Sequence, residues 1–317
     1  MKILFFGTPR FAEIVLQGLI ESRHEVVGVV CQNDKPSGRG NKMKSPHIVD
    51  MAKAHGIPVF QFEKLSQHID DFKKIDCDLG VTASYGKILP KSLLDILSFV
   101  NVHPSLLPKY RGATPIQTAL LNGDTKTGVT IMKTEVGMDD GDIYLQEEAE
   151  ILPEDDYVSL LDRLAEQGLK LLLKVLDEIE NGTATRTPQD SSKATFVRLI
   201  KKEDGLLDFS ENVGTLVNKV RAYCENPVAF FFVGGERIKV FKAKVANMST
   251  SAPVGEIVST KKRFLIQAKD GVFEILKCQA SGGKVLDASA FLNGFRFKTT
   301  SVDEISEDGK KSTAVGV

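Results

Sequence analysis

The chain has 317 residues, 42% of them hydrophobic and 26% charged, a composition typical of a folded soluble protein with about two domains. Its formal net charge of −1 implies no overall attraction to a polyanion or to a membrane surface. Its apolar runs are all shorter than the roughly 18 residues of a membrane span, which excludes a membrane-spanning helix.

The first third of the chain alternates short apolar runs with helical patterns. Apolar residues at helical spacing predict one helix after Pro9 and another at 45–56, capped by Ser45 and ended by Gly56. The first apolar run ends at Gly7, so we interpret it as a strand and not as a secretion signal. Together the runs predict strands at 2–6, 26–31, 58–61, 78–84 and 98–103. Such an alternation indicates an α/β fold, a doubly wound and mostly parallel Rossmann-like sheet covered on both faces.

The rest of the chain divides at a polar stretch. Strands at 127–134 and 142–151 and a helix from about 155 to 181 complete a domain predicted to span residues 1–182. Residues 183–205 lack apolar clusters and are predicted to be a linker. A helix at 213–224 opens the region 206–310, for which short alternating runs predict a small OB-like β-barrel domain. These runs lie at 229–235, 236–246, 255–260, 263–271 and 272–279.

Charge and cysteine content add two expectations. Residues 206–300 contain 14 Lys and Arg against 8 Asp and Glu, which suits a polyanion such as RNA. An ordinary solvated surface can carry the same surplus, so this alternative stays open. The four cysteines lie far apart without a C-x-x-C pair, which favours reduced thiols and a cytoplasmic location.

The residues that could carry chemistry follow predicted strands. In an open parallel sheet, ligands bind beyond the carboxyl ends of the strands, and three loops start there. GTPRF follows the first strand, ASYGKILP the fourth and NVHPSLLPKYRG the fifth, while VGMDDGD at 136–142 joins two later strands. GTPRF does not have the G-x-G-x-x-G spacing, so a nicotinamide-binding domain is not supported.

Asn101 and His103 are the strongest catalytic candidates. Side chains two residues apart on a strand project from the same face, so both can enter one cleft. An amide that stabilises an oxyanion and an imidazole that moves a proton are the groups that acyl transfer needs. The carboxylate that orients the imidazole could come from Asp139, Asp140 or Asp142. The alternative is that His103 is a structural histidine at a strand end, with its hydrogen bonds satisfied.

The stretch NDKPSGRGNKMK at 33–44 is basic and rich in glycine. Lys35, Arg39, Lys42 and Lys44 could approach a phosphate backbone. The alternative is an ordinary solvated linker, although strand-to-helix connections usually have only about two to six residues.

Taken together, these motifs resemble the folate-dependent formyltransferases over nearly the full chain. The N-x-H with SLLPKYRG is specific to that family, and the GRG loop with the predicted C-terminal barrel narrows the resemblance to the methionyl-tRNA formyltransferases. The nearest alternative is a sugar-nucleotide N-formyltransferase, and a rival of another class is an RNA-binding protein without activity. The chain has no Trp, although relatives often have one near the start of the barrel. The matching motifs are FFGTPRFA, DKPSGRGNKMKSP, ASYGKILP, NVHPSLLPKYRGATPIQ and GVTIMKTEVGMDDGD.

The resemblance implies transfer of a formyl group from 10-formyltetrahydrofolate to the α-amino group of methionine on initiator methionyl-tRNA, in support of translation initiation. It assigns catalysis to Asn101, His103 and Asp139 and requires no metal. It places folate against Ser105, Leu106, Leu107, Pro108, Tyr85 and Gly86, in a loop shaped by Gly112, Pro115 and Gln117. It assigns tRNA contacts to Arg39, Lys42 and Lys44. We expect a cytoplasmic monomer without membrane contact.

Overall fold

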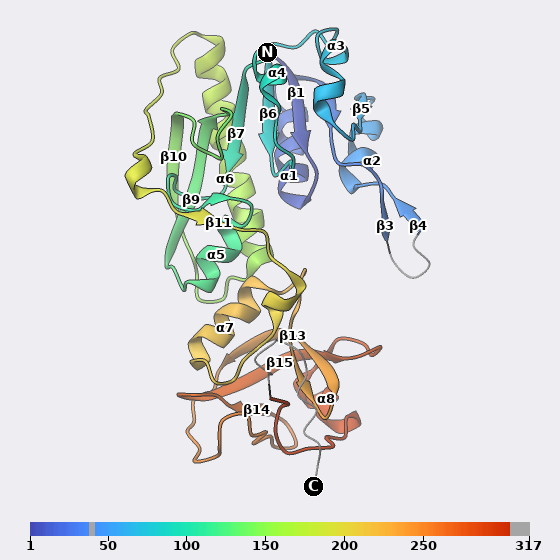
Figure 1. The fold of residues 1–317 in the computed structure, drawn as a ribbon, viewed down its shortest axis with the longest axis vertical. Coiled ribbons are helices and arrows are strands. Elements are labelled where there is room, and N and C mark those ends of the chain that lie inside the picture. The colour runs from blue at the N-terminus through green and yellow to red at the C-terminus, as the bar shows by residue number, and fades with distance from the viewer. Residues whose placement is uncertain (38–41, 305–317) are drawn as a thin grey trace. The chain divides into compact units, whose positions relative to one another are not determined.

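The computed structural model describes residues 1–37 and 42–304, which form two compact units (Figure 1). Unit 1 contains residues 1–115, 126–150 and 160–198. Unit 2 contains residues 116–125, 151–159 and the chain from 199 onward. No helix within the described part of the chain is long and apolar enough to cross a membrane.

Unit 1 is built on a seven-stranded sheet with the order β10-β9-β7-β6-β1-β2-β5. β1, β2, β5, β6 and β7 run parallel, whereas β9 is antiparallel to β7 and β10 is antiparallel to β9. The predicted α/β fold with a mostly parallel sheet is therefore confirmed. The strands are β1 (Lys2–Gly7), β2 (Glu25–Val30), β5 (Val59–Phe60), β6 (Leu79–Ala83), β7 (Phe99–His103), β9 (Lys126–Lys133) and β10 (Ile143–Glu150).

Two long helices cover one face of this sheet, α1 (Arg10–Ile20) and α6 (Tyr157–Glu180). A Cβ atom added at Gly168 of α6 would lie 2.7 Å from Val102 Cγ1 of β7. A Cβ atom at Gly18 of α1 would overlap the side chain of Leu169 in α6, 1.9 Å from its Cδ2 atom. Glycine at these two positions therefore lets α6 approach both the sheet and α1 closely.

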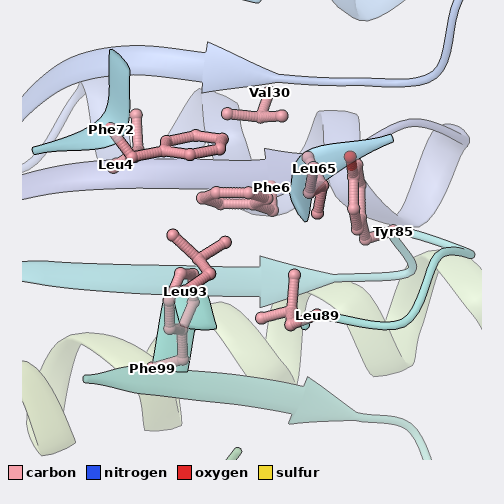
Figure 2. Packing of buried hydrophobic residues seen from close by; sticks show 9 residues of the cluster. All are labelled: Leu4, Phe6, Val30, Leu65, Phe72, Tyr85, Leu89, Leu93 and Phe99. Carbon is pink, nitrogen blue, oxygen red and sulfur yellow. The ribbon is translucent and has the colours of Figure 1, made fainter. Parts of the chain in front are cut away.

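The opposite face carries an aromatic core, shown in Figure 2. The Phe6 ring lies edge-on to Tyr85 at 5.3 Å and to Phe99 at 5.1 Å between ring centroids. Short helices close this face, namely η1 (Leu65–Gln67), α3 (Ile69–Phe72) and α4 (Lys91–Leu94). Because both faces are covered, only the ends of the central strands are left for polar chemistry. The buried cluster consists of Leu4, Phe6, Val30, Leu65, Phe72, Tyr85, Leu89, Leu93 and Phe99.

Unit 2 is built on an antiparallel sheet with the order β12-β13-β15-β14, and β16 pairs with β15. The expected C-terminal domain of short strands is thereby confirmed, and its strands are antiparallel. Within the described residues no ladder joins β12 to β14, so the OB-like closure stays a prediction. The elements are α5 (Pro115–Leu121), η3 (Lys202–Gly205), α7 (Val213–Ala222), β12 (Ala229–Val233), β13 (Glu236–Val245), β14 (Phe264–Gln267), β15 (Val272–Ala280), β16 (Leu286–Asp287) and α8 (Ala288–Gly294).

Several short elements differ from the sequence-based expectations. The second helix, α2 (His47–Ala54), begins after Pro46, and Ser45 does not cap it because its hydroxyl donates to Asp34 Oδ2 at 2.9 Å. The prediction of a strand at 255–260 is wrong, since only isolated bridges form there, at Glu256 and Ile257. The short helices of both units were not predicted, and the same holds for two pairs of short strands. These pairs are β3 (Lys35–Ser37) with β4 (Lys42–Lys44), and β8 (Arg111–Gly112) with β11 (Phe196–Val197), which lies near η2 (Ser191–Lys193).

Candidate active site

Asn101 and His103 lie at the carboxyl end of β7, between β6 and β9. Asn101 is in register with Thr82 of β6, and His103 with Thr130 of β9. The Thr82 hydroxyl donates to Asn101 Oδ1 at 2.8 Å, which fixes the orientation of the amide. The amide nitrogen Nδ2 is thereby the donor of the group, and it donates a long hydrogen bond to Asp139 Oδ1 with one of its two N–H groups.

His103 uses its two ring nitrogens differently. Its side chain is 5% exposed, and Nε2 lies 3.0 Å from the main-chain oxygen of Tyr110. Because a carbonyl oxygen only accepts, the proton of the neutral imidazole resides on Nε2. Nδ1 then faces Asp139, with 3.7 Å between Nδ1 and Oδ2. One ring nitrogen is thus held structurally, and the other is the atom that can take up or release a proton.

Asp139 completes the group from the loop between β9 and β10. Its Oδ1 lies 3.4 Å from Asn101 Nδ2, and its Oδ2 accepts a hydrogen bond of 2.8 Å from the main-chain nitrogen of Gly112. Asp139 has a φ of +49°, the left-handed conformation that residues with a Cβ atom seldom adopt. That conformation turns this carboxylate, and not those of Asp140 or Asp142, toward His103.

The predicted folate-binding stretch is a rigid turn directly after His103. Ser105 and Leu107 are buried, whereas Leu106 and Pro108 are half-buried. The Thr130 hydroxyl donates to the main-chain oxygen of Ser105 at 2.6 Å and accepts from the main-chain nitrogen of Leu107 at 3.2 Å. Gln146 Nε2 donates to the Leu107 oxygen at 3.0 Å. The turn is therefore fixed from β9 and β10 before any ligand binds.

Tyr85 and Gly86 follow β6 but present different surfaces. The Tyr85 ring points into the aromatic core (Figure 2) and is 4% exposed. Its hydroxyl has no hydrogen-bond partner among the described residues, and burial raises the pKa of this phenol. Gly86 has a φ of +73°, and the main-chain oxygen of Tyr85 accepts a hydrogen bond from Gln32 Nε2 at 3.2 Å. Only the main chain of this stretch therefore remains for a ligand.

The predicted tRNA-binding residues lie in or beside the β3–β4 hairpin. Arg39 lies outside the described residues, and Lys42 is described only through its main chain. Lys44 is exposed and pairs with Lys35 in the register of the two strands. Hydrogen bonds and close polar contacts join Asn101, His103 and Asp139, but within the described residues none joins them to Lys44.

Sequence reasoning missed a second set of residues around Asp139. Gln189 Nε2 donates to the main-chain oxygens of Asp139 at 2.9 Å and Gly141 at 2.7 Å. Gln189 Oε1 in turn accepts from Arg111, at 3.0 Å from Nε and 2.8 Å from Nη2. Arg111 stands in the motif SLLPKYRG, but Gln189 lies in a polar stretch without periodicity, so no sequence signal pointed to it.

The described residues contain no group of three or more His, Cys, Asp or Glu side chains placed to hold a metal ion. The four cysteines are free thiols. Burial raises the pKa of the Cys31 thiol to about 11, so it stays protonated near neutral pH. The arrangement supports hydrogen bonding to a developing oxyanion and proton transfer.

Comparison with known families matches both units. The family described as formyl transferase matches residues 1–176, and the formyl transferase C-terminal domain matches residues 199–296. The methionyl-tRNA formyltransferase of Sulfurihydrogenibium sp. (strain YO3AOP1) is 41% identical over 305 residues, covering 94% of this chain and 98% of the relative. That of Lactobacillus johnsonii is also 41% identical, over 97% of this chain and 99% of the relative.

Solved structures share the fold at lower identity. HypX from Aquifex aeolicus in complex with tetrahydrofolic acid has a TM-score of 0.67 and 18% identity, covering 93% of this chain and 47% of HypX. The sugar 3N-formyl transferase WlaRD has a TM-score of 0.65 and 21% identity, covering 90% of this chain and 99% of WlaRD. At these identities the likeness extends to the fold alone.

Proposed function

The chain belongs to the methionyl-tRNA formyltransferase family, and from this premise we propose that Asn101, His103 and Asp139 catalyse its reaction. The enzyme transfers the formyl group of 10-formyltetrahydrofolate to the α-amino group of methionine on initiator methionyl-tRNA, a step that supports translation initiation. The observation that carries the proposal is the convergence of an amide donor, an imidazole and a carboxylate at one strand end.

The first step is attack of the methionyl amine on the formyl carbon that folate carries on N10. A bond forms between the amine nitrogen and this carbon, and the formyl oxygen gains negative charge in the tetrahedral intermediate. Asn101 Nδ2 donates a hydrogen bond to that oxygen, because Thr82 already holds the amide in the donor orientation. A donor oriented before the reaction stabilises the charge without reorganisation.

The second step breaks the bond between the formyl carbon and N10. The amine must lose a proton and N10 must gain one, so a group that carries the proton between them lowers the barrier. We assign this transfer to Asp139 together with His103 Nδ1, since His103 Nε2 is hydrogen-bonded to the main-chain oxygen of Tyr110. The imidazolium form of His103 can also donate from Nδ1 to the oxyanion while Asp139 balances its charge.

We further propose how the substrates are held. Folate lies against the turn Ser105–Pro108 and the main chain of Tyr85 and Gly86, while Arg39, Lys42 and Lys44 contact the tRNA. The limits we propose are a catalytic domain at 1–182, a linker at 183–205 and an OB-like, tRNA-binding domain at 206–310. We propose a cytoplasmic monomer. Support for the tRNA-binding domain comes from the basic surplus of residues 206–300.

An acceptor comparison tests the proposed function. The purified full chain is supplied with 10-formyltetrahydrofolate and either methionyl-tRNA or a dTDP-linked amino sugar, and tetrahydrofolate release is followed. We expect release with methionyl-tRNA and none above background with the amino sugar. Faster formylation of the amino sugar would establish the alternative of a sugar-nucleotide N-formyltransferase.

A further inference from the structure

We propose that Gln189 is a positioning residue for the catalytic carboxylate and that Arg111 holds Gln189 in place. The inference rests on the role proposed above for Asp139. It assigns a function to a side chain in the polar stretch 183–205, which the sequence offered only as a linker. Gln189 touches no reacting atom and acts through the main chain of the Asp139 loop.

The hydrogen bonds form a closed ring around Asp139. Arg111 donates to Gln189 Oε1, and Gln189 Nε2 donates to the oxygens of Asp139 and Gly141. The ring closes where the nitrogen of Gly112, the residue after Arg111, donates to Asp139 Oδ2 at 2.8 Å. The two residues of β8 therefore hold both parts of Asp139: Arg111 holds its main chain through Gln189, and Gly112 holds its carboxylate directly.

The conformation of Asp139 explains why such a ring is needed. Its φ of +49° is uncommon even though aspartate tolerates it better than most residues, so contacts that hold the loop favour this conformation over the commoner ones. Gln189 supplies two of these contacts, because one amide nitrogen bridges the oxygens on either side of Asp140. Without this bridge the loop can relax toward a commoner conformation and turn the carboxylate away from His103.

The chemistry of the ring requires glutamine at this position. The Arg111 guanidinium only donates and the two carbonyl oxygens only accept, so the amide must present oxygen to one and nitrogen to the others. Arg111 is 4% exposed, and a buried charged donor makes a strong hydrogen bond to the Gln189 oxygen. Glutamate has the oxygen but lacks the donor, which makes it the informative substitution.

The main chain delivers Gln189 to this place in a fixed register. The Arg111 nitrogen donates to the Thr195 oxygen at 2.8 Å, and β8 pairs with β11 at Arg111 opposite Phe196. A Cβ atom at Gly112 would lie 2.4 Å from the Val197 oxygen, so the two strands meet more closely than other residues would allow. The alternative is that Gln189 only fixes the chain around β11 to the rest of unit 1, without an effect on the reaction.

The test compares Gln189→Glu and Gln189→Met in the full chain, with the concentrations of 10-formyltetrahydrofolate and methionyl-tRNA each varied to give kcat and KM. Glutamate keeps the Arg111 contact and loses the donor, whereas methionine loses both. For positioning, both variants should lower kcat by about tenfold to a hundredfold with KM for both substrates unchanged, and Gln189→Glu, which keeps a partner for Arg111, should retain the wild-type Tm. Anchoring alone predicts that Gln189→Glu retains wild-type kcat, and that result would overturn the proposal. Ser192→Ala is the control, because it removes only an exposed hydrogen bond to Asp190 and should leave kcat unchanged.

A double variant separates failure of this inference from failure of the proposed function. If Gln189 acts through Asp139, adding Gln189→Met to Asp139→Asn should cause no further loss of kcat. Wild-type turnover by Asp139→Asn alone would contradict the catalytic role of Asp139 itself. Loss of turnover in Asp139→Asn together with wild-type kcat in both Gln189 variants would overturn only the positioning role. If Gln189→Met lowers Tm, Gln189→Glu alone decides.

Discussion

The two sheets of the molecule place their polar and charged side chains in different ways. In unit 1, β6 is buried at every residue and β7 at all but Asn101, and their few polar side chains lie toward the carboxyl ends. In unit 2, β13 and β15 bring exposed lysines such as Lys242 and Lys277 into the middle of the sheet. A sheet covered on both faces offers an edge for chemistry, whereas a sheet with a solvated face offers a surface for binding.

This difference predicts that substitutions in the two sheets will have separate consequences. Changes at the end of β7 should alter turnover without altering tRNA affinity, and changes on β13 and β15 should do the reverse. Changes in either core should lower stability without a specific effect on the reaction. The predictions below follow from this contrast, and each can contradict it.

The largest effect is expected in the aromatic core of unit 1. Phe6→Ala removes a ring that contacts Phe72, Tyr85 and Phe99 and should destabilise unit 1 by about 3–5 kcal/mol. Hydrogen exchange followed by mass spectrometry should show faster exchange in β1, β6 and β7. The matched variant is Phe231→Ala in unit 2, where the ring is 1% exposed and lies 5.5 Å from that of Phe209. If both variants accelerate exchange in both sheets equally, the units do not unfold separately.

The next effect concerns catalysis at the end of β7. His103→Ala and Asp139→Asn should each raise the barrier by about 2.7–4 kcal/mol, the loss typical of one group that stabilises developing charge. Single-turnover formylation of methionyl-tRNA measures this, and the binding constants for both substrates should stay unchanged. Asp140→Asn is the matched control, since this neighbouring carboxylate has no contact with His103 among the described residues. Equal losses in Asp139→Asn and Asp140→Asn would contradict the assignment of a single carboxylate.

The strands of unit 1 could be predicted from the sequence because strands buried on both faces consist almost entirely of apolar residues, and such runs are visible in the local composition. The sequence also predicted the shared face of Asn101 and His103, because alternation along a strand is independent of tertiary structure. The preference for Asp139 came from family resemblance, since three carboxylates lie within four residues. Its left-handed φ of +49° depends on partners such as Gln189, which lies 50 residues away.

Other features could not be predicted because they arise from pairing between distant segments. β8 and β11 have two residues each and carry no periodicity, yet their pairing brings Gln189 to Asp139. Tyr85 was expected beside folate, but Ser84 has a φ of +46° and the next side chain turns back into the core. Alternating runs predicted strands in unit 2, but they do not specify which strands pair, so barrel closure stays a prediction.

A smaller effect is expected at the ion pair of unit 2 between the buried Glu274 and the partly exposed Arg263. Glu274 is 6% exposed and accepts from Arg263 Nε at 2.9 Å and Nη2 at 2.7 Å. These hydrogen bonds from Arg263 lower the pKa of Glu274. A carboxyl whose pKa is lower in the folded state stabilises the fold above its unfolded pKa of about 4.3, and this contribution is lost as the pH falls below that value.

Glu274→Gln should therefore reduce the free energy of unfolding at pH 7 by about 1–3 kcal/mol and make the loss of stability between about pH 5 and pH 3 shallower. Urea unfolding at several pH values measures both. The control is Glu148→Gln in unit 1, whose pair with Lys126 is half exposed and should contribute less than about 1 kcal/mol. An unchanged acid profile in Glu274→Gln would show that the pair does not stabilise unit 2.

The smallest stability effect has the opposite sign and concerns the solvated face of unit 2. Lys242 on β13 pairs with Lys277 on β15 at a shift in the strand register, and both side chains are exposed. Like charges in this position are destabilising by roughly 0.2–1 kcal/mol, which is unfavourable unless the pair meets an anion. Lys277 also lies opposite Asp287 of β16, so Lys242 is the lysine whose removal relieves only the like charge. Lys242→Gln should thus stabilise unit 2 by a few tenths of a kcal/mol.

Lys242→Gln should also weaken methionyl-tRNA binding and reduce the slope of log affinity against log salt by about 1. Lys170→Gln, at an exposed lysine on α6, is the control and should leave that slope unchanged. A slope that is the same for Lys242→Gln and the wild type would mean that this face does not bind the tRNA backbone, and the two sheets would then differ only in their effects on stability.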